Sequence, residues 1–181
     1  MRGVLTGLRR DRRGVSTVEF ALLAPVLIVL YFGVGELCEG MMAQRRVAHS
    51  AAAIGDLVTQ NTSVSASQMS DIFSAAAIIL QPFPTNSLQQ RVTSVTVNAQ
   101  GNPAVDWSCA TGGLAPYTVG STYRGLPSGI VQNQGESVVV SEGRYKWSSP
   151  ANYVVPGGIA LAQTSYFQPR QSGTITGPQS C

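Results

Sequence analysis

Arg12-Arg13-Gly14-Val15-Ser16-Thr17-Val18-Glu19-Phe20 opens an apolar run that continues to Gly35. Residues 15–35 would form a helix of roughly 31 Å at about 1.5 Å per residue, long enough to cross the hydrocarbon core of a bilayer. Glu19 is the only charged residue in this run, and an ionised carboxylate inside a membrane costs roughly 2.5–3.5 kcal/mol on insertion scales. A residue kept at that cost indicates a function in addition to anchoring.

Basic residues are concentrated before this run. Five of the twelve lysines and arginines lie in the first thirteen positions, which leaves seven basic and eight acidic residues from position 15 onward. By the positive-inside rule, this cluster stays cytoplasmic and the chain after Gly35 lies across the membrane. The main body has no basic excess, so we expect no nucleic-acid partner. Its low share of charged residues, 12% over the whole chain, is typical of an exported domain. The five residues are Arg2, Arg9, Arg10, Arg12 and Arg13.

Four interpretations of this N-terminus are open. A secretory signal peptide would be cut after the apolar run, where Gly33-Val34-Gly35 has a small-x-small pattern. A lipoprotein needs a small residue before the acylated cysteine, whereas Leu37 precedes Cys38. A plain signal anchor explains neither Glu19 nor the abrupt change at Gly14. The fourth interpretation is a leader that is cut on the cytoplasmic side, before the apolar run.

Residues 14–20 resemble the Gly-x-x-x-x-Glu-Phe/Tyr site that type IV prepilin peptidases cut in the tight-adherence (Tad, or Flp-type) pilus system. The sequences Ala21-Leu22-Leu23-Ala24-Pro25 and Gly33-Val34-Gly35-Glu36 that follow resemble TadE- and TadG-like minor pseudopilins. The resemblance implies cleavage between Gly14 and Val15, and assembly or recognition through Glu19 and Phe20. The partners it implies are prepilin peptidase, other Tad pilins and pseudopilins, the inner-membrane assembly platform and the lipid bilayer.

The spacing of the site also has a physical explanation. Cleavage after Gly14 would create a cationic α-amino group at the end of an apolar helix, with Glu19 about one turn further in. In a bundle of such helices, the carboxylate of one chain can face the amine of its neighbour, which offsets part of both burial costs. Glu19 is therefore expected to favour assembly. Pro25 removes one helical hydrogen bond and is expected to bend the helix.

Beyond the membrane, residues 37–60 are expected to continue this helix. On a helical wheel, a narrow stripe of mostly small residues lies within about 60° of Leu37 and would let another helix or a sheet approach closely. The alternative is a short juxtamembrane helix with a solvated face. Glu36, Glu39 and His49 come nearest to a metal site, but they do not share one helical face, so no metal is expected. The stripe comprises Met41, Ala48, Ala51, Ala52, Gly55 and Val58, with Glu39, Arg46 and His49 on the far side.

The rest of the chain predicts an α+β domain that is pilin-like in outline. A linker at residues 61–66 precedes a second helix, capped by Ser67 or Ser70 and ending near Leu80. Alternating patterns predict strands at residues 91–97, 104–110, 136–147 and 159–167, which would form a small antiparallel sheet. The expected organisation is a basic cytoplasmic leader (1–14), a transmembrane helix (15–36), its extramembrane extension (37–60), the linker and a periplasmic domain (67–181).

The three cysteines differ in position. Cys38 lies at the membrane edge, whereas Cys109 and Cys181 lie in the exported domain and are the natural pair in an oxidising compartment. The alternatives are two free thiols, or a Cys181 that links to another subunit.

No motif for catalysis or cofactor binding is present in the sequence. We therefore expect no enzyme and no cofactor. Two functional hypotheses remain open. The first is a bitopic minor pseudopilin that is processed by prepilin peptidase. The second is an uncleaved, single-pass envelope protein whose periplasmic domain binds a surface partner.

Overall fold

The structure, a computed structural model, describes residues 14–131, 133–149, 156–179 and 181. These residues form α2 (Val15–Thr59), α3 (Ala66–Ile78), β1 (Leu88–Val97), β2 (Pro103–Thr111), β3 (Ser137–Trp147) and β4 (Ile159–Phe167). The predicted α+β class, with a long N-terminal helix, a second helix and a small antiparallel sheet, is confirmed. Apart from Gly14, the predicted leader at residues 1–14 lies outside the described residues.

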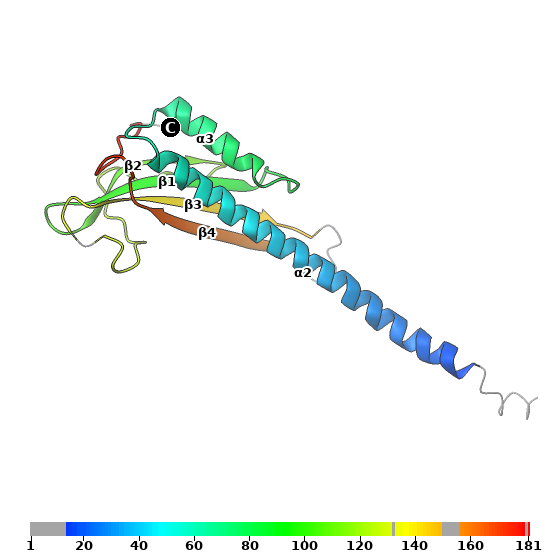
Figure 1. Ribbon diagram of the computed structural model, residues 1–181. Helices are drawn as coiled ribbons and strands as arrows, with labels where there is room; N and C mark the ends of the chain where they lie inside the picture. Colours follow the sequence, from blue (N-terminus) through cyan, green and yellow to red (C-terminus); the bar gives the residue numbers. More distant parts are fainter. Residues whose placement is uncertain (1–13, 132, 150–155, 180) are drawn as a thin grey trace, which may run out of the picture.

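The strands form one antiparallel sheet in the order β2-β1-β3-β4. Figure 1 shows α2 and α3 on one face of this sheet, with α2 running along β3 and β4 and then projecting far beyond them. The central strands β1 and β3 are buried along most of their length. They are rich in valine and threonine, whose branched side chains favour a pleated, covered surface.

The face of α2 that packs on the sheet differs from the predicted stripe. Ala51, Gly55 and Val58 are buried as expected, but Leu37 and Met41 are 55% and 57% exposed. The buried face is rotated because α3 also covers α2, on the side opposite Leu37 and Met41, a contact that a wheel of one helix does not include. The remaining buried apolar residues of this face are Ala43, Val47 and Ile54.

The contact with α3 also changes the environment of polar residues on α2. Arg46, predicted to face solvent, is half-buried and donates from Nη1 to the carbonyl oxygen of Ile79 (3.0 Å). Ser50 Oγ donates to the carbonyl oxygen of Ala76 (2.9 Å) and accepts from Gln90 Nε2 (2.9 Å). One buried hydroxyl therefore joins α2, α3 and β1.

Small residues let α2 lie close to the sheet. A Cβ atom on Gly55 would collide with the ring of Phe167, and one on Gly143 would meet Val47 at 3.3 Å. Ser141 Oγ donates a short hydrogen bond to the carbonyl oxygen of Ala51. Gly35, in the projecting half of the same helix, has no atom within 4 Å of its hypothetical Cβ. Side-chain size is therefore restricted only where the helix meets the sheet.

The start of α3 differs from the prediction. Ser65, rather than Ser67 or Ser70, is the N-cap, and it forms a capping box with Gln68. Gln68 occupies the N3 position only for a helix that begins at Ala66, and a capping box satisfies two backbone donors where a serine alone satisfies one. The helix ends at Ile78 rather than near Leu80.

The segment predicted as a linker is paired with the C-terminal part of the chain. Val64 is 4% exposed, and its backbone N–H donates to the carbonyl oxygen of Thr176 (2.8 Å). The N–H of Thr176 in turn donates to the carbonyl oxygen of Thr62 (3.1 Å). The connection between the two helices is thus held by residues more than one hundred positions away.

A buried ion pair lies on the opposite face of the sheet. Arg91 Nε and Glu142 Oε2 are 2.6 Å apart, and both side chains are less than 10% exposed. The guanidinium also donates to the carbonyl oxygen of Ala115 (2.9 Å) and to the hydroxyl of Tyr117 (2.8 Å). Burial alone would lower the pKa of Arg91, but the hydrogen bond and charge of Glu142 raise it. The pair therefore fastens the segment that follows β2 to the sheet.

We expect Glu142→Gln to destabilise the domain by about 3–5 kcal/mol, because the Arg91 guanidinium would remain buried without a balancing charge. Chemical denaturation of the full chain in detergent micelles, followed by tryptophan fluorescence, measures the change. Asp56→Asn is the matched control, since the Asp56–Arg170 pair (2.6 Å) is exposed and should contribute at most about 1 kcal/mol. Equal losses in the two variants would contradict this account.

Candidate functional site

The two halves of α2 have opposite surroundings. Residues 15–35 include none that is buried, and Phe20, Leu22 and Tyr31 are 68%, 70% and 75% exposed. An 18-residue window of the helix has a mean hydropathy of 2.1 and is not buried inside the protein at all. This half has the length and composition of a single-pass membrane anchor. The other half is a structural element of the domain.

Gly14 and Val15, the predicted processing site, lie where α2 begins. Gly14 is the N-cap and Val15 is the first helical residue, and the N–H of Val18 donates to the carbonyl oxygen of Gly14 (3.2 Å). The first N–H groups of a helix have no partner within it. Cleavage at this bond would therefore remove no residue of the helix itself.

Glu19 and Phe20 lie about one turn into α2, with exposed side chains. Across the parts of the chain that the structure describes, Glu19 has no hydrogen-bond or ion-pair partner. Val15 and Glu19 are four residues apart in one helix, so both side chains lie on the same face. The carboxylate is thus presented on the outer surface of the anchor, near the start of the helix.

Pro25 lies in the middle of the anchor, and α2 continues through it without a break. The helix in Figure 1 is one continuous rod. The missing N–H removes one helical hydrogen bond, but the turns on either side stay in register.

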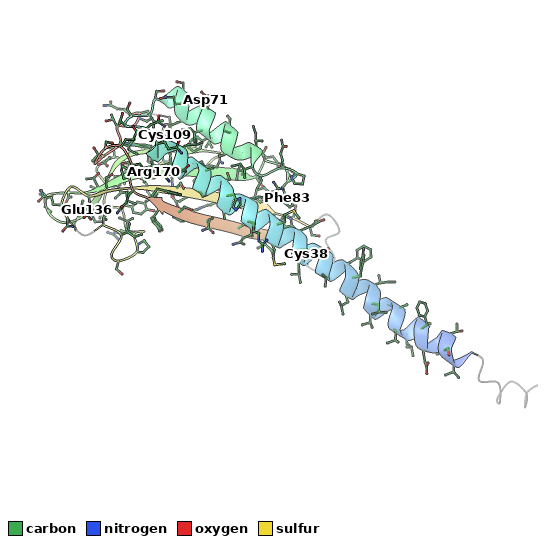
Figure 2. All side chains as sticks on the ribbon, in the orientation of Figure 1. Cys38, Asp71, Phe83, Cys109, Glu136 and Arg170 are labelled. Atoms are coloured by element: carbon green, nitrogen blue, oxygen red, sulfur yellow. A yellow bond between two sulfur atoms is a disulfide. The ribbon has the colours of Figure 1, made fainter. Side chains whose placement is uncertain are left out.

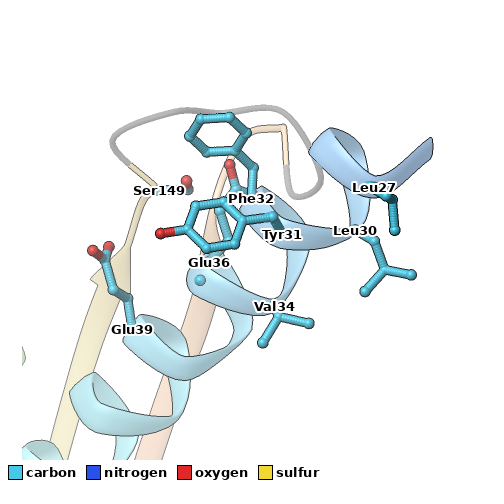
Figure 3. A pocket seen from close by; sticks show the side chains of 9 residues that line it. Leu27, Leu30, Tyr31, Phe32, Val34, Glu36, Glu39 and Ser149 are labelled. Atoms are coloured by element: carbon cyan, nitrogen blue, oxygen red, sulfur yellow. The ribbon is translucent and has the colours of Figure 1, made fainter. Parts of the chain in front are cut away.

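The anchor meets the domain beside a cavity of about 820 Å³, shown in Figure 3. Glu36, the first buried residue of α2, is 5% exposed and lies here with Ser149 at the end of β3. One turn further on, the ring of Trp147 packs against Gly40. The mostly apolar wall of the cavity therefore continues the apolar surface of the anchor. Its other lining residues are Leu27, Leu30, Tyr31, Phe32, Val34, Gly35 and Glu39.

The residues considered for a metal site differ in environment. Glu36 is buried, whereas Glu39 and His49 are exposed. In the described ranges, no group of three or more histidine, cysteine or acidic residues is arranged to hold a metal ion.

The C-terminal segment is clamped at the far end of the domain. Cys109 and Cys181 form a disulfide with Cα atoms 5.4 Å apart, whereas Cys38 is a free, exposed thiol. Trp107 Nε1 donates to the carbonyl oxygen of Ile175 (2.7 Å), and Gly177 lies so close to the Trp107 ring that a Cβ would collide with it. Apart from the cysteines, the sequence analysis did not identify these contacts, because a tryptophan and a glycine seventy residues apart form no motif.

Comparison with known proteins identifies the N-terminal part of the chain. Residues 14–55 match the family model described as TadE-like protein. This segment is TadE-like. The TadE-like segment contains the predicted processing site, the whole anchor and the part of α2 that packs on the sheet as far as Gly55. The match indicates a protein related to the Tad pilus. No curated protein and no solved structure matches the chain.

For the domain that the TadE-like helix carries, we expect reduction to be destabilising. The Cys109–Cys181 bond closes a separation of 72 residues, and the chain-entropy model gives about 4 kcal/mol for such a loop. Cys181→Ser should lose about this amount in chemical denaturation, while Cys38→Ser, the matched control, should not change stability.

Peptide mapping without reductant tests the bond directly. It should yield one linked peptide that contains Cys109 and Cys181, with maleimide labelling of Cys38 alone. A dimer linked through Cys181 would contradict the internal bond.

Proposed function

We propose that this protein is a minor pseudopilin, or pilus assembly protein, of a Tad-type secretion system, and that it acts by helix-mediated assembly rather than by catalysis. The division of α2 is the observation that carries this proposal. Its first half is an exposed apolar helix with one carboxylate, and its second half is fixed to a sheet. A helix of this kind holds a folded domain at a set position relative to helices that pack beside it in the membrane. The TadE-like match over both halves supports the same role.

Prepilin peptidase is the proposed processing enzyme, with cleavage between Gly14 and Val15. The site precedes the helix, so cleavage would release residues 1–14 and leave α2 complete. The new α-amino group would lie at the positive end of the helix dipole, which disfavours a cation there. A carboxylate close to this amine offsets that cost. Glu19 is the acidic residue nearest to the new terminus.

Two carboxylates could pair with the new amine in an assembly. One is the chain's own Glu19, which is four residues away on the same face. The other is Glu19 of a neighbouring subunit. Pairing between subunits rewards assembly because a single helix in lipid has few other polar partners. We propose that this reward is the function of Glu19, and that Phe20 contributes apolar contact area beside it.

The proposed location is the bacterial inner membrane, with the N-terminus cytoplasmic and the domain periplasmic. The arginines before residue 15 support this orientation, and a disulfide is compatible with an oxidising compartment. The proposed partners are prepilin peptidase, other Tad pilins and pseudopilins, the assembly platform and the lipid bilayer.

N-terminal sequencing of the protein from cells with an active prepilin peptidase tests the processing. We expect a mature chain that begins at Val15, and an intact leader when Gly14 is replaced by Leu. Gly35→Leu is the matched control, because its hypothetical Cβ meets no neighbouring atom and it lies far from the bond. A mature terminus after Gly35 would show a signal peptide instead. An intact Met1 would favour the uncleaved envelope protein.

Glu19→Ala should keep or improve membrane insertion, since it removes a cost of roughly 2.5–3.5 kcal/mol, while pilus assembly decreases. Insertion is measured by carbonate extraction, and assembly by shearing and quantifying pili. Glu39→Ala, an exposed carboxylate outside the predicted span, is the control and should assemble normally. Normal pili and unchanged crosslinks between subunits in Glu19→Ala cells would rule out amine pairing.

A further inference from the structure

The charges of the domain are unevenly distributed along its length. Figure 2 places Asp71, Glu136 and Arg170 at the end far from the anchor, and Cys38 where the anchor enters the domain. Arg144 and Lys146 lie near the end of β3, which is the end of the sheet closest to the anchor (Figure 1). Two cations of β3 therefore lie on the side of the domain that faces the bilayer.

These two cations stand on the face of the sheet opposite α2. Tyr145 and Trp147 pack in the core beneath the helix, and side chains alternate between the two faces of a strand. Arg144 and Lys146 therefore point to the other face. The segment after β2 covers this face further from the membrane, where Tyr123 packs on Val138 and Val140. The region around Arg144 and Lys146 is left outside that cover.

A groove of about 560 Å³ lies between these cations and the edge strand β4. Lys146 is paired across the strands with Ala160, and Arg144 with Ala162. An alanine methyl group neither neutralises nor shields its cationic neighbour, so the floor of the groove is low and the charges rise above it. Asn86 and Gln89 add amide donors to the wall.

The positive charge of the groove is only slightly compensated. The carboxylate nearest to Arg144 belongs to Glu142, at 3.9 Å, and its other oxygen is held by Arg91 at 2.6 Å. The Arg144 side chain is 50% exposed, and Lys146 is exposed. The groove thus offers a forked guanidinium, a mobile ammonium and amide donors, a combination that suits a phosphate oxygen.

The distance to the bilayer decides which phosphate reaches the groove. Trp147 packs on Gly40, four residues after the predicted end of the span, or about 6 Å along the helix at ~1.5 Å per residue. Lys146 is one strand residue further, about 3.3 Å. The headgroup layer is itself roughly 5–8 Å thick on each side of the hydrocarbon core. Lys146 therefore lies at its border, and Arg144 lies within about one Debye length of it.

We propose that this groove binds the headgroup of an anionic phospholipid, with Lys146 and Arg144 on the phosphate and Ala160 and Ala162 beneath it. The bound headgroup fixes the tilt of the domain on the membrane, because the groove and α2 lie on opposite faces of the sheet. The inference requires only that the first half of α2 crosses a bilayer. It does not rest on pseudopilin function or on cleavage after Gly14.

The test uses the full chain in nanodiscs of phosphatidylcholine, alone or in equimolar mixture with phosphatidylglycerol. Native mass spectrometry measures how much phosphatidylglycerol remains bound. Hydrogen exchange reports on residues 144–147 and 159–162, which should exchange more slowly in the anionic discs. Lys146→Glu should reduce the retained phosphatidylglycerol at least about fivefold, the factor for ~1 kcal/mol per basic side chain at an anionic surface.

Two charge-matched controls separate a groove from general attraction. Arg45→Glu lies on α2 nine residues after Glu36, and Arg124→Glu lies beyond β2 at the far end; both side chains are exposed. Neither should change retention by the groove. An equal loss in Arg45→Glu would overturn the proposal in favour of a diffuse effect.

Ala160→Tyr fills the groove without changing the charge and should also reduce retention, which covers the case that Lys146→Glu does not fold. Retention unchanged in Ala160→Tyr, or no slower exchange in the anionic discs, would overturn the site.

Discussion

The close packing of α2 on β3 and β4 is the constraint on which the rest of the structure depends. One 45-residue helix passes through two surroundings, and only the second restricts side-chain size. Ala51 and Gly55 allow contact with Ser141 and Phe167, whereas the apolar half has no such neighbours. Because the helix is continuous, any position taken by the sheet is transmitted rigidly to the membrane. The domain is thus oriented by the anchor and is not free on a flexible tether.

Polar contacts complete what apolar burial leaves open. Ser50 joins α2, α3 and β1, and Arg91 and Glu142 hold the segment after β2 against the outer face. Buried polar groups are costly unless each has a partner. These contacts therefore specify one arrangement of elements more than they add net stability. The C-terminal segment serves the same end through Trp107 and the Cys109–Cys181 bond.

The functional surface follows from what the domain leaves uncovered. Glu19 is presented on the anchor, and the cavity beside Glu36 continues the apolar surface toward the sheet. Arg144 and Lys146 face the same border from the other side of the sheet. Recognition in this protein is therefore concentrated at the level of the membrane and just above it, while the far end is occupied by the clamp on the C-terminal segment.

The sequence by itself determined the elements whose signal is local. The uncharged run after Glu19 set the anchor, the glycine before it marked the start of the helix, and period-two patterns located the strands, since each depends only on neighbouring residues. Tertiary structure decided the rest. The buried face of α2 was rotated toward Ala43 and Val47 because α3 packs there, and Ser65 capped α3 because Gln68 completed the box. The Arg91–Glu142 pair, the linker bound to Thr176 and the groove over Ala160 join residues far apart in the chain. No local pattern records such contacts, because they form only when the strands come into register.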